Sequence, residues 1–444
     1  MLKAGTAIVD VSPTTPMFLV GYPHVPRTST GIHDPLCATA LALDNGSAAV
    51  IKVAVDILFF NPPTARELRR RIAAATGVAE TGVFVSCTHT HSGPSTFDML
   101  NWQDDPVVPP YDPAYLARIT AGVVDAATRA WQGRVPAELA WTACQVDGVG
   151  CNRHRPDAPR DPECGILAVR SPQTRRLLAL ATVYAMHPTV LHEDSTLVSA
   201  DFPGCCRRYL GARLGEDVAV LYDNGLCGNL SPRYHVKNQT FAEAERLGNR
   251  LGEFIAQAVA KLADADYSDA PVLAGALEKV AIERRIFPSV AEAEAILTTA
   301  RADYERLKAE GAPHGPVRTA ECSVFGAEET LTLARLQAAG AVDAVMANYN
   351  PIEVQVIRIG DCCQAGFPCE TFVEYGLEFK PKTALKTHPV TLVNGELHGY
   401  IVTEAAFAQG GYEAWNSFFA PSVGARLAGT ATRLVARLAT LVPC

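Results

Sequence analysis

Hydrophobic residues recur along the chain in two ways, as short apolar runs of strand length and as longer amphipathic stretches of helix length. The clearest strand pair is 38–43 with 48–55, because the Asp-Asn-Gly turn between them favours a tight antiparallel hairpin. A second hairpin is expected between 166–170 and 177–186. Further strands are predicted at 7–11, 82–85, 218–222 and 352–359.

Amphipathic periodicity predicts helices at 63–75, 113–131, 241–262 and 423–441. Residues 288–340 are also helical in pattern and are richer in Glu, Lys and Arg, with a Gly- and Pro-containing break at 311–316. Strands and helices alternate through the chain without repeats or low-complexity linkers. The sequence therefore predicts an α/β fold of mixed β-sheets flanked by helices, in a single domain over 1–444 with a helical insertion or lid at about 288–340.

The segment 86–94 has the sequence Ser-Cys-Thr-His-Thr-His-Ser-Gly-Pro and continues the apolar run at 82–85. Alternate side chains of a strand point to the same side, so His89 and His91 are expected on one face where the strand ends. Two adjacent imidazoles can bind a metal ion, or one can bind it while the other works beside it. Cross-strand packing is the structural alternative for such a pair.

Three more polar residues follow predicted strands. His187 directly follows the second hairpin, and Ser231 lies beyond the strand 218–222. Glu370 comes after the strand 352–359 and its partner, and we expect it in the first turn of a helix. Ligand sites in open α/β sheets gather outside the carboxyl ends of strands, so these residues are candidates for the same site as the histidine pair.

Short motifs in this order along residues 5–415 resemble the N-terminal catalytic domain of the neutral/alkaline ceramidase family. They are Gly31-Ile32-His33-Asp34, Thr88-His89-Thr90-His91-Ser92-Gly93-Pro94, Asn152-Arg153, Ala185-Met186-His187-Pro188-Thr189, Gly228-Asn229-Leu230-Ser231-Pro232, Pro368-Cys369-Glu370, and the pair Tyr400 and Tyr412. The His-Thr-His-Ser-Gly-Pro block is the most specific of these, and the Asn-Leu-Ser-Pro block is next.

The resemblance implies a ceramidase-like catalytic domain with one Zn²⁺ per chain. The metal ligands implied by it are His89, His187, Glu370 and Tyr400. The catalytic residues implied by it are His91, Arg153, Tyr412 and Ser231. In this scheme His91 works beside the metal, Arg153 and Tyr412 contact the scissile carbonyl, and Ser231 lies near the substrate.

The chemistry of this residue set is consistent with hydrolysis. Two imidazoles and a carboxylate form a catalytic zinc set that leaves a position for water. Zinc lowers the pKa of bound water to about 7, so hydroxide is available to attack a carbonyl. The developing oxyanion needs donors such as His91, Tyr412 or Arg153. The chain has no Gly-x-Ser-x-Gly motif, so we expect Ser231 to contact the substrate or the oxyanion rather than to attack.

Composition and charge exclude some classes of binding partner. The net charge of −8 and the absence of a basic patch argue against a nucleic-acid partner, and without a run of Lys or Arg no stable membrane association is expected. No apolar stretch is long enough for a transmembrane helix. The 13 cysteines are odd in number and lack a Cys-x-x-Cys motif, which predicts reduced thiols and a cytoplasmic location. The sequence does not indicate the oligomeric state.

Secreted members of the family carry an export signal and a further immunoglobulin-like C-terminal domain, and this sequence resembles a short form with neither. We therefore expect a soluble small-molecule N-acyl amide as substrate rather than membrane-embedded ceramide. The predicted function is zinc-dependent hydrolysis of a carbon–nitrogen bond by metal-activated water. The alternatives are a metal-dependent ester or lactone hydrolase, a barrel-type amidohydrolase and a non-catalytic metal-containing binding protein. The hairpins argue against the barrel, which needs eight successive strand–helix units.

Overall fold

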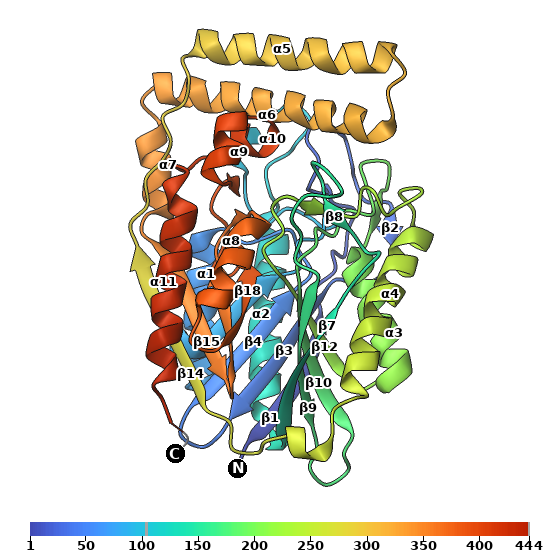
Figure 1. Cartoon of the computed structure of the whole chain (residues 1–444), viewed down its shortest axis with the longest axis vertical. Helices are drawn as coiled ribbons and strands as arrows, with labels where there is room; N and C mark the ends of the chain where they lie inside the picture. Colours follow the sequence, from blue (N-terminus) through green and yellow to red (C-terminus); the bar gives the residue numbers. More distant parts are fainter. Residues whose placement is uncertain (103–104, 443–444) are drawn as a thin grey trace.

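The computed structural model describes residues 1–102 and 105–442, and within these ranges three β-sheets of four or five strands form the centre (Figure 1). The first sheet contains, in spatial order, β5 (Val83–Cys87), β4 (Ala49–Val55), β3 (Cys37–Asp44), β1 (Lys3–Asp10) and β6 (Val135–Pro136). The second contains β12 (Ala219–Asn224), β10 (Leu177–Tyr184), β9 (Glu163–Arg170) and β7 (Glu138–Gln145). The third contains β14 (Leu273–Val280), β15 (Ile352–Ile359), β16 (Cys362–Phe367) and β18 (Lys386–Thr391).

Short two-stranded ladders lie in the loops between these strands. They pair β2 (Gly31–Ile32) with β11 (Leu197–Val198), β8 (Cys151–Asn152) with β13 (Leu230–Ser231), and β17 (Glu370–Thr371) with β19 (Tyr400–Ile401). The helices are α1 (Pro62–Thr76), α2 (Pro113–Gln132), α3 (Asp201–Leu214), α4 (Phe241–Val259), α5 (Val290–Ala309), α6 (His314–Ala338), α7 (Val342–Tyr349), α8 (Val373–Phe379), α9 (Glu404–Gln409), α10 (Tyr412–Trp415) and α11 (Ser422–Ala439).

Each large sheet contains one parallel strand pair at its edge, although its other neighbouring strands run antiparallel. The parallel pairs are β4–β5, β10–β12 and β16–β18. Parallel strands need a crossover connection, and here α1, α3 and α8 supply it in turn. The fold therefore contains three βαβ units, one in each sheet. The chain leaves the carboxyl ends of these strands in the loops that carry the site.

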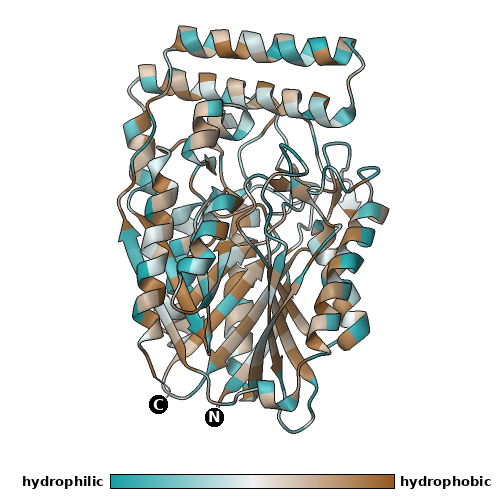
Figure 2. Ribbon diagram, in the orientation of Figure 1, coloured by the Kyte–Doolittle hydropathy of each residue, from teal (hydrophilic) through white to brown (hydrophobic). Residues whose placement is uncertain are grey.

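The helices cover the outer faces of the sheets. α1 and α2 pack on the first sheet, α3 and α4 on the second, and α11 on the third. α5 packs along α6, and this helical hairpin crosses the end of the molecule opposite both chain termini (Figure 1). Figure 2 shows that the central strands are mostly hydrophobic, whereas hydrophilic residues are frequent along α5. The break between α5 and α6 falls at 310–313, so α6 begins inside the segment 311–316 that was expected to interrupt the helices.

The three sheets meet around a buried polar network. Lys52 of β4 donates to Asp223 of β12 at 2.6 Å, and its ammonium also contacts Gln364 of β16. Ser86 of β5 donates to the other oxygen of Asp223 at 2.6 Å. All four side chains are almost completely buried. Burial lowers the pKa of Lys52, and Asp223 opposes that shift. The buried ion pair of Lys52 with Asp223, together with its hydrogen-bond partners, thus connects the three sheets.

Most predicted elements are present. The hairpin β3–β4, the strand β15 and the helix α2 lie where the pattern predicts them, and Asp112 caps α2 by accepting from the backbone N–H of Ala114 and Tyr115. The expectation for Glu370 is wrong. It lies in β17 and not in a helix, since α8 begins only at Val373.

The open mixed sheets also rule out the eight-stranded parallel barrel. Within the described ranges, no helix is both long and apolar enough to span a lipid bilayer. The cysteines there form no disulfide, and Cys444 lies outside the described residues. The cytoplasmic location and the single-domain division stay predictions.

Candidate metal centre

The three βαβ units bring imidazole and carboxylate side chains to one point. His89 and His91 follow β5 of the first unit. His187 follows β10 of the second unit, and Glu370 follows β16 of the third. The ligand nitrogens of the three histidines lie within 4.8 Å of one another. The structure therefore brings together four residues that the sequence locates after predicted strands.

His89 and His91 converge for a different reason from the one expected. β5 ends at Cys87, and His89 has a φ of +70°, in the left-handed region that non-glycine residues seldom adopt. Strand alternation therefore does not extend from His89 to His91. The turn instead places the two rings edge to face, with centroids 4.8 Å apart. Backbone strain of this kind clusters at functional sites.

Each of the three imidazoles places Nδ1 against a backbone carbonyl oxygen. The N···O distances are 3.1 Å for His89 with Leu58, 3.0 Å for His91 with Gly21 and 2.7 Å for His187 with Cys227. A carbonyl oxygen can only accept, so Nδ1 donates a proton to it, and Nε2 is the ring nitrogen that faces the centre. Histidine ligands of metal sites are oriented in the same way.

Glu370 supplies a negative charge to this cluster. Its Oε2 lies 2.9 Å from Nε2 of His187 and 3.3 Å from Nε2 of His89. Burial tends to raise the pKa of Glu370, but the two histidines outweigh this effect and hold it well below its usual range. Burial lowers the pKa of His187 to about 4 and that of His91 well below its usual value. Carboxylate and neutral imidazole are the forms that bind a cation.

Tyr400 reaches the centre through a short parallel ladder, because β17 and β19 pair Glu370 with Tyr400. Its ring packs edge to face on Tyr412 with centroids 5.5 Å apart. The Arg153 guanidinium lies 5.1 Å from the Tyr400 centroid and 5.6 Å from the Tyr412 centroid, and Glu413 pairs with it at 2.5 Å. Burial raises the pKa of both tyrosines, so their hydroxyls stay protonated in the protein alone.

Ser231 lies on the same wall as Arg153. The ladder of β8 with β13 pairs Ser231 with Cys151, and Arg153 directly follows β8. The Ser231 oxygen accepts from the backbone N–H of Arg233 at 3.1 Å. No histidine or carboxylate in the described ranges forms a hydrogen bond with Ser231, so the base that a nucleophilic serine needs is missing from its surroundings there.

A cavity of about 70 Å³ opens onto this centre. The expected site residues on its wall are His91, His187, Tyr400, Arg153, Tyr412 and Ser231. Helix α6 closes one side with Arg318, Cys322 and Phe325. Sequence reasoning missed Arg233, His192 and these α6 residues, and it missed Glu413 behind Arg153. Only Glu413 had a usable signal, since it directly follows Tyr412.

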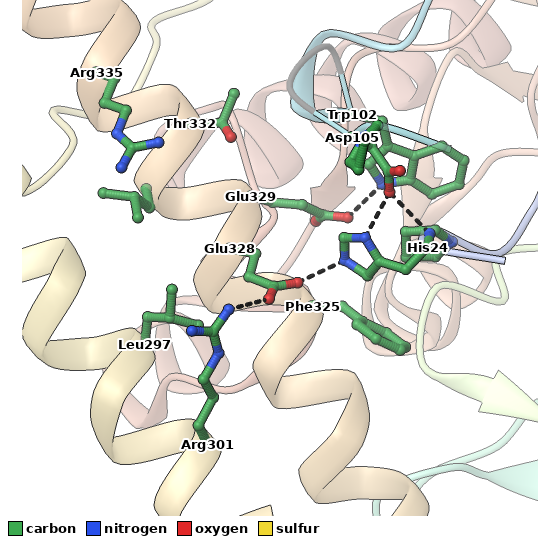
Figure 3. Close-up of a pocket in the computed structure, with 13 residues that line it drawn as sticks. His24, Trp102, Asp105, Leu297, Arg301, Phe325, Glu328, Glu329, Thr332 and Arg335 are labelled. Atoms are coloured by element: carbon green, nitrogen blue, oxygen red, sulfur yellow. Dashed lines mark hydrogen bonds and ion pairs between the residues drawn. The ribbon is translucent and has the colours of Figure 1, made fainter. Parts of the chain in front are cut away.

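A larger cavity of about 350 Å³ lies between α5, α6 and the segment around Trp102 (Figure 3). Pro23 and Phe325 line both cavities, so the two adjoin. On its wall, Trp102 Nε1 donates to Glu329 of α6 at 2.8 Å. The helical hairpin thus bounds the candidate centre and the space beside it.

An ion network joins α6 to two loops across this larger cavity. His24 lies 2.6 Å from Asp105 through Nδ1 and 2.6 Å from Glu328 of α6 through Nε2 (Figure 3). Arg301 of α5 also pairs with Glu328, at 2.7 Å. The hydrogen bond to Glu328 raises the pKa of His24, with smaller contributions from Asp105 and Glu329. Both ring nitrogens can donate only when the imidazole is protonated.

We expect His24→Gln to lower the melting temperature at pH 6 by about 1–2 °C and to leave it unchanged at pH 9. A histidine whose pKa is raised on folding stabilises the protein below its unfolded pKa, and this contribution is lost as the pH rises through the folded pKa. The partial exposure of the ring keeps the effect small. Thermal melts of both proteins from pH 6 to pH 9 measure the difference, and a constant difference across that range would contradict the charge assignment.

Both the sequence and the fold of this chain are similar to those of known proteins. The sequence model of the family described as "Neutral/alkaline non-lysosomal ceramidase, N-terminal" matches residues 2–219. Just under half of the chain is therefore similar in sequence to the neutral/alkaline ceramidase family. The chain is also similar to the neutral ceramidase of Mycobacterium tuberculosis, with 23% identity over 225 residues that cover 46% of this chain and 35% of that protein. The match therefore spans about a third of the relative's length.

Two solved structures share the fold over the whole chain. The neutral ceramidase of Pseudomonas aeruginosa superposes with a TM-score of 0.76 and 17% identity, over 100% of this chain and 75% of that one. A structure described as ceramidase complexed with C2 gives a TM-score of 0.77 at 17% identity, over 100% of this chain and 76% of that one. The predicted α/β fold of mixed sheets flanked by helices is thereby confirmed, as is the resemblance to the ceramidase family.

Proposed function

We propose that this chain is a zinc-dependent amide hydrolase, with one Zn²⁺ per chain held by His89, His187, Glu370 and Tyr400. The observation that carries the proposal is the orientation of the imidazoles, whose Nδ1 atoms are fixed by backbone carbonyls while their Nε2 atoms converge beside a carboxylate. Nitrogen-rich sites of two histidines and one glutamate suit zinc rather than magnesium or calcium, which prefer oxygen ligands. The family match of residues 2–219 supports the same reaction class.

Zinc bound at such a site lowers the pKa of a water molecule and polarises a carbonyl. Side chains of the protein would transfer the proton and stabilise the negative charge. His91 lines the cavity with Nδ1 fixed on Gly21, so Nε2 is the atom that can accept a proton from water and pass it to the departing amine. Arg153 and Tyr412 line the same cavity as donors for the carbonyl oxygen as negative charge develops on it. Ser231 would contact the substrate.

The test is metal content together with a substrate screen. Protein purified without added metal is expected to contain close to one zinc per chain, and it should hydrolyse N-acyl amides in a reaction that a chelator abolishes. Esters and lactones of the same acyl groups serve as the comparison. Hydrolysis of esters or lactones alone would overturn the amide assignment. Bound zinc without turnover of any of the three classes would indicate a binding protein instead.

His91 has a separate test. His91→Ala is expected to keep its zinc and to lower kcat at least about a hundredfold, because general acid–base catalysis contributes roughly this much. The geometry behind this expectation is that Glu370 Oε2 lies 2.9 Å from His187 and 3.3 Å from His89, whereas the close contact of His91 Nε2 is with His89 Nε2, at 3.3 Å, and not with Glu370. Metal analysis and steady-state kinetics give the two readings. Stoichiometric loss of zinc would instead make His91 a ligand.

A further inference from the structure

Arg233 lies on the wall between two cavities. It lines the 70 Å³ cavity with His91 and His187, and it also lines a neighbouring cavity of about 300 Å³ with His154 and Trp415. The residue follows β13 by two positions, and its backbone N–H is bonded to Ser231. Its side chain is only half-buried. Arg233 therefore stands where a substrate in the inner cavity would extend into the outer one.

The contacts of the Arg233 guanidinium are all uncharged. Nη1 donates to the carbonyl oxygen of Arg153 at 3.3 Å and to Thr319 Oγ1 at 3.0 Å. Nη2 makes only a weak contact with Cys322 Sγ at 3.8 Å. Over residues 1–102 and 105–442, no carboxylate forms an ion pair with Arg233, and its Nε donates no hydrogen bond. The edge formed by Nε and Nη2 is the edge to which a carboxylate can bind through two parallel hydrogen bonds.

The other two arginines that line the inner cavity form ion pairs with acidic residues. Arg153 pairs with Glu413, and Arg318 pairs with Glu193 at 2.8 Å and Glu321 at 2.7 Å. Arg233 is thus the arginine of this wall whose charge has no acidic partner in the part of the chain that the structure describes.

The inner cavity itself is lined by three arginines and three histidines, and no aspartate or glutamate of the described residues is among its lining. A narrow cleft lined by one sign of charge focuses its field and attracts the opposite charge. Glu413 pairs with Arg153, and Glu193 and Glu321 pair with Arg318, so Arg233 is the cation of this lining that makes no contact with an acid of the described residues. A substrate carboxylate at this position would complete the pairing.

We propose that the preferred substrates are amides that bear a carboxylate a few bonds from the scissile carbon–nitrogen bond, as in N-acyl amino acids, and that Arg233 binds this carboxylate. The inference rests on the proposed hydrolase function and specifies its substrate class. In the reaction the C–N bond breaks, the oxygen of water joins the acyl carbon, and the amine leaves with a proton from water. Arg233 takes no part in these bond changes and acts only in binding the substrate.

The test compares matched pairs of substrates, N-acyl glycines and the corresponding N-acyl glycinamides, with acyl groups from acetyl to lauroyl. The wild-type protein is expected to prefer the carboxylate of each pair at least about tenfold in kcat/KM. Arg233→Gln should lower kcat/KM for the carboxylate substrate about ten- to a hundredfold and so abolish the preference, because the variant cannot form the charge-assisted hydrogen bonds with the carboxylate. The loss should fall on KM with kcat nearly unchanged, since the contact is equal in the bound substrate and the transition state. Arg233→Lys, which keeps the positive charge, should retain part of the preference for the carboxylate substrate.

Arg155 provides a matched control. It carries the same charge near the site but lies in solvent, 72% exposed, against Asp157. Arg155→Gln should therefore keep the wild-type preference. Equal turnover of acid and amide by the wild type, or an equal loss on both substrates in Arg233→Gln, would overturn the substrate inference and leave the hydrolase function standing.

Failure of the hydrolase function gives a different result. If no amide turns over, calorimetric titration of the same substrate pairs into the zinc-containing wild type and Arg233→Gln still measures recognition of the carboxylate. Tighter binding of the acid that depends on Arg233 would support the inference without catalysis. Equal binding of acid and amide by the wild type would overturn it.

Discussion

Glu370→Gln is expected to release most of the bound zinc and to lower kcat/KM for amide hydrolysis by about a thousandfold or more. Oε2 of Glu370 contacts both His89 and His187, and the substitution removes the charge while keeping the shape of the side chain. A neutral amide is a much weaker ligand for a divalent cation than a carboxylate is. Metal analysis after gel filtration and kinetics with added zinc measure both effects.

The matched control for this substitution is Glu374→Gln in α8. Glu374 accepts hydrogen bonds from the Asn229 side chain at 2.9 and 3.2 Å, and it does not contact the histidines in the structure. This variant should keep its zinc and its activity. Full zinc occupancy in Glu370→Gln would contradict the proposed ligand set and would favour binding by the three imidazoles of His89, His91 and His187, which already lie within 4.8 Å of one another.

The largest expected effect on stability is at Lys52. Lys52→Met should destabilise the fold by about 3–5 kcal/mol, because it leaves the buried carboxylate of Asp223 without a cation. The melting temperature should fall by about 3–5 °C, because the unfolding entropy of a chain of this length is large. Denaturant unfolding followed by circular dichroism measures the free energy, and the zinc content of the folded fraction shows whether the centre is retained.

A second substitution separates the lost charge from lost packing. Adding Asp223→Asn to Lys52→Met removes the unpaired charge and keeps an acceptor for the Ser86 hydroxyl. The double variant should recover more than half of the lost stability, since replacing a buried ion pair with neutral groups is often nearly neutral. A double variant that is as unstable as Lys52→Met would show that the loss came from the shape of the lysine side chain.

Much of the local structure follows from the sequence. The Asp-Asn-Gly turn correctly predicts the hairpin of β3 with β4, and alternation correctly predicts β15 with both of its ends. The location of His89, His187 and Glu370 after strands correctly suggested that they meet, because chain reversals at the carboxyl ends of strands gather polar groups. These features depend on residues close together in the sequence.

Features that depend on distant residues could not be predicted in the same way. The pairing of Glu370 with Tyr400 requires the register of a two-residue ladder, which two residues are too few to indicate. The left-handed backbone at His89 is held by its surroundings and not by its residue type. The balance of charge around Arg233 depends on which acids pair with the other two arginines, and those acids come from α6, from α10 and from the loop at 193.

The convergence of one donor from each sheet has a thermodynamic consequence. A metal ion with ligands from all three sheets can bind only when the sheets are packed together. Its affinity is therefore thermodynamically linked to the packing of the sheets against one another. Substitutions far from the ion that loosen the contacts between layers should therefore weaken its affinity, and saturating zinc should offset part of the loss. Chelation would then lower the cooperativity of unfolding as well as catalysis.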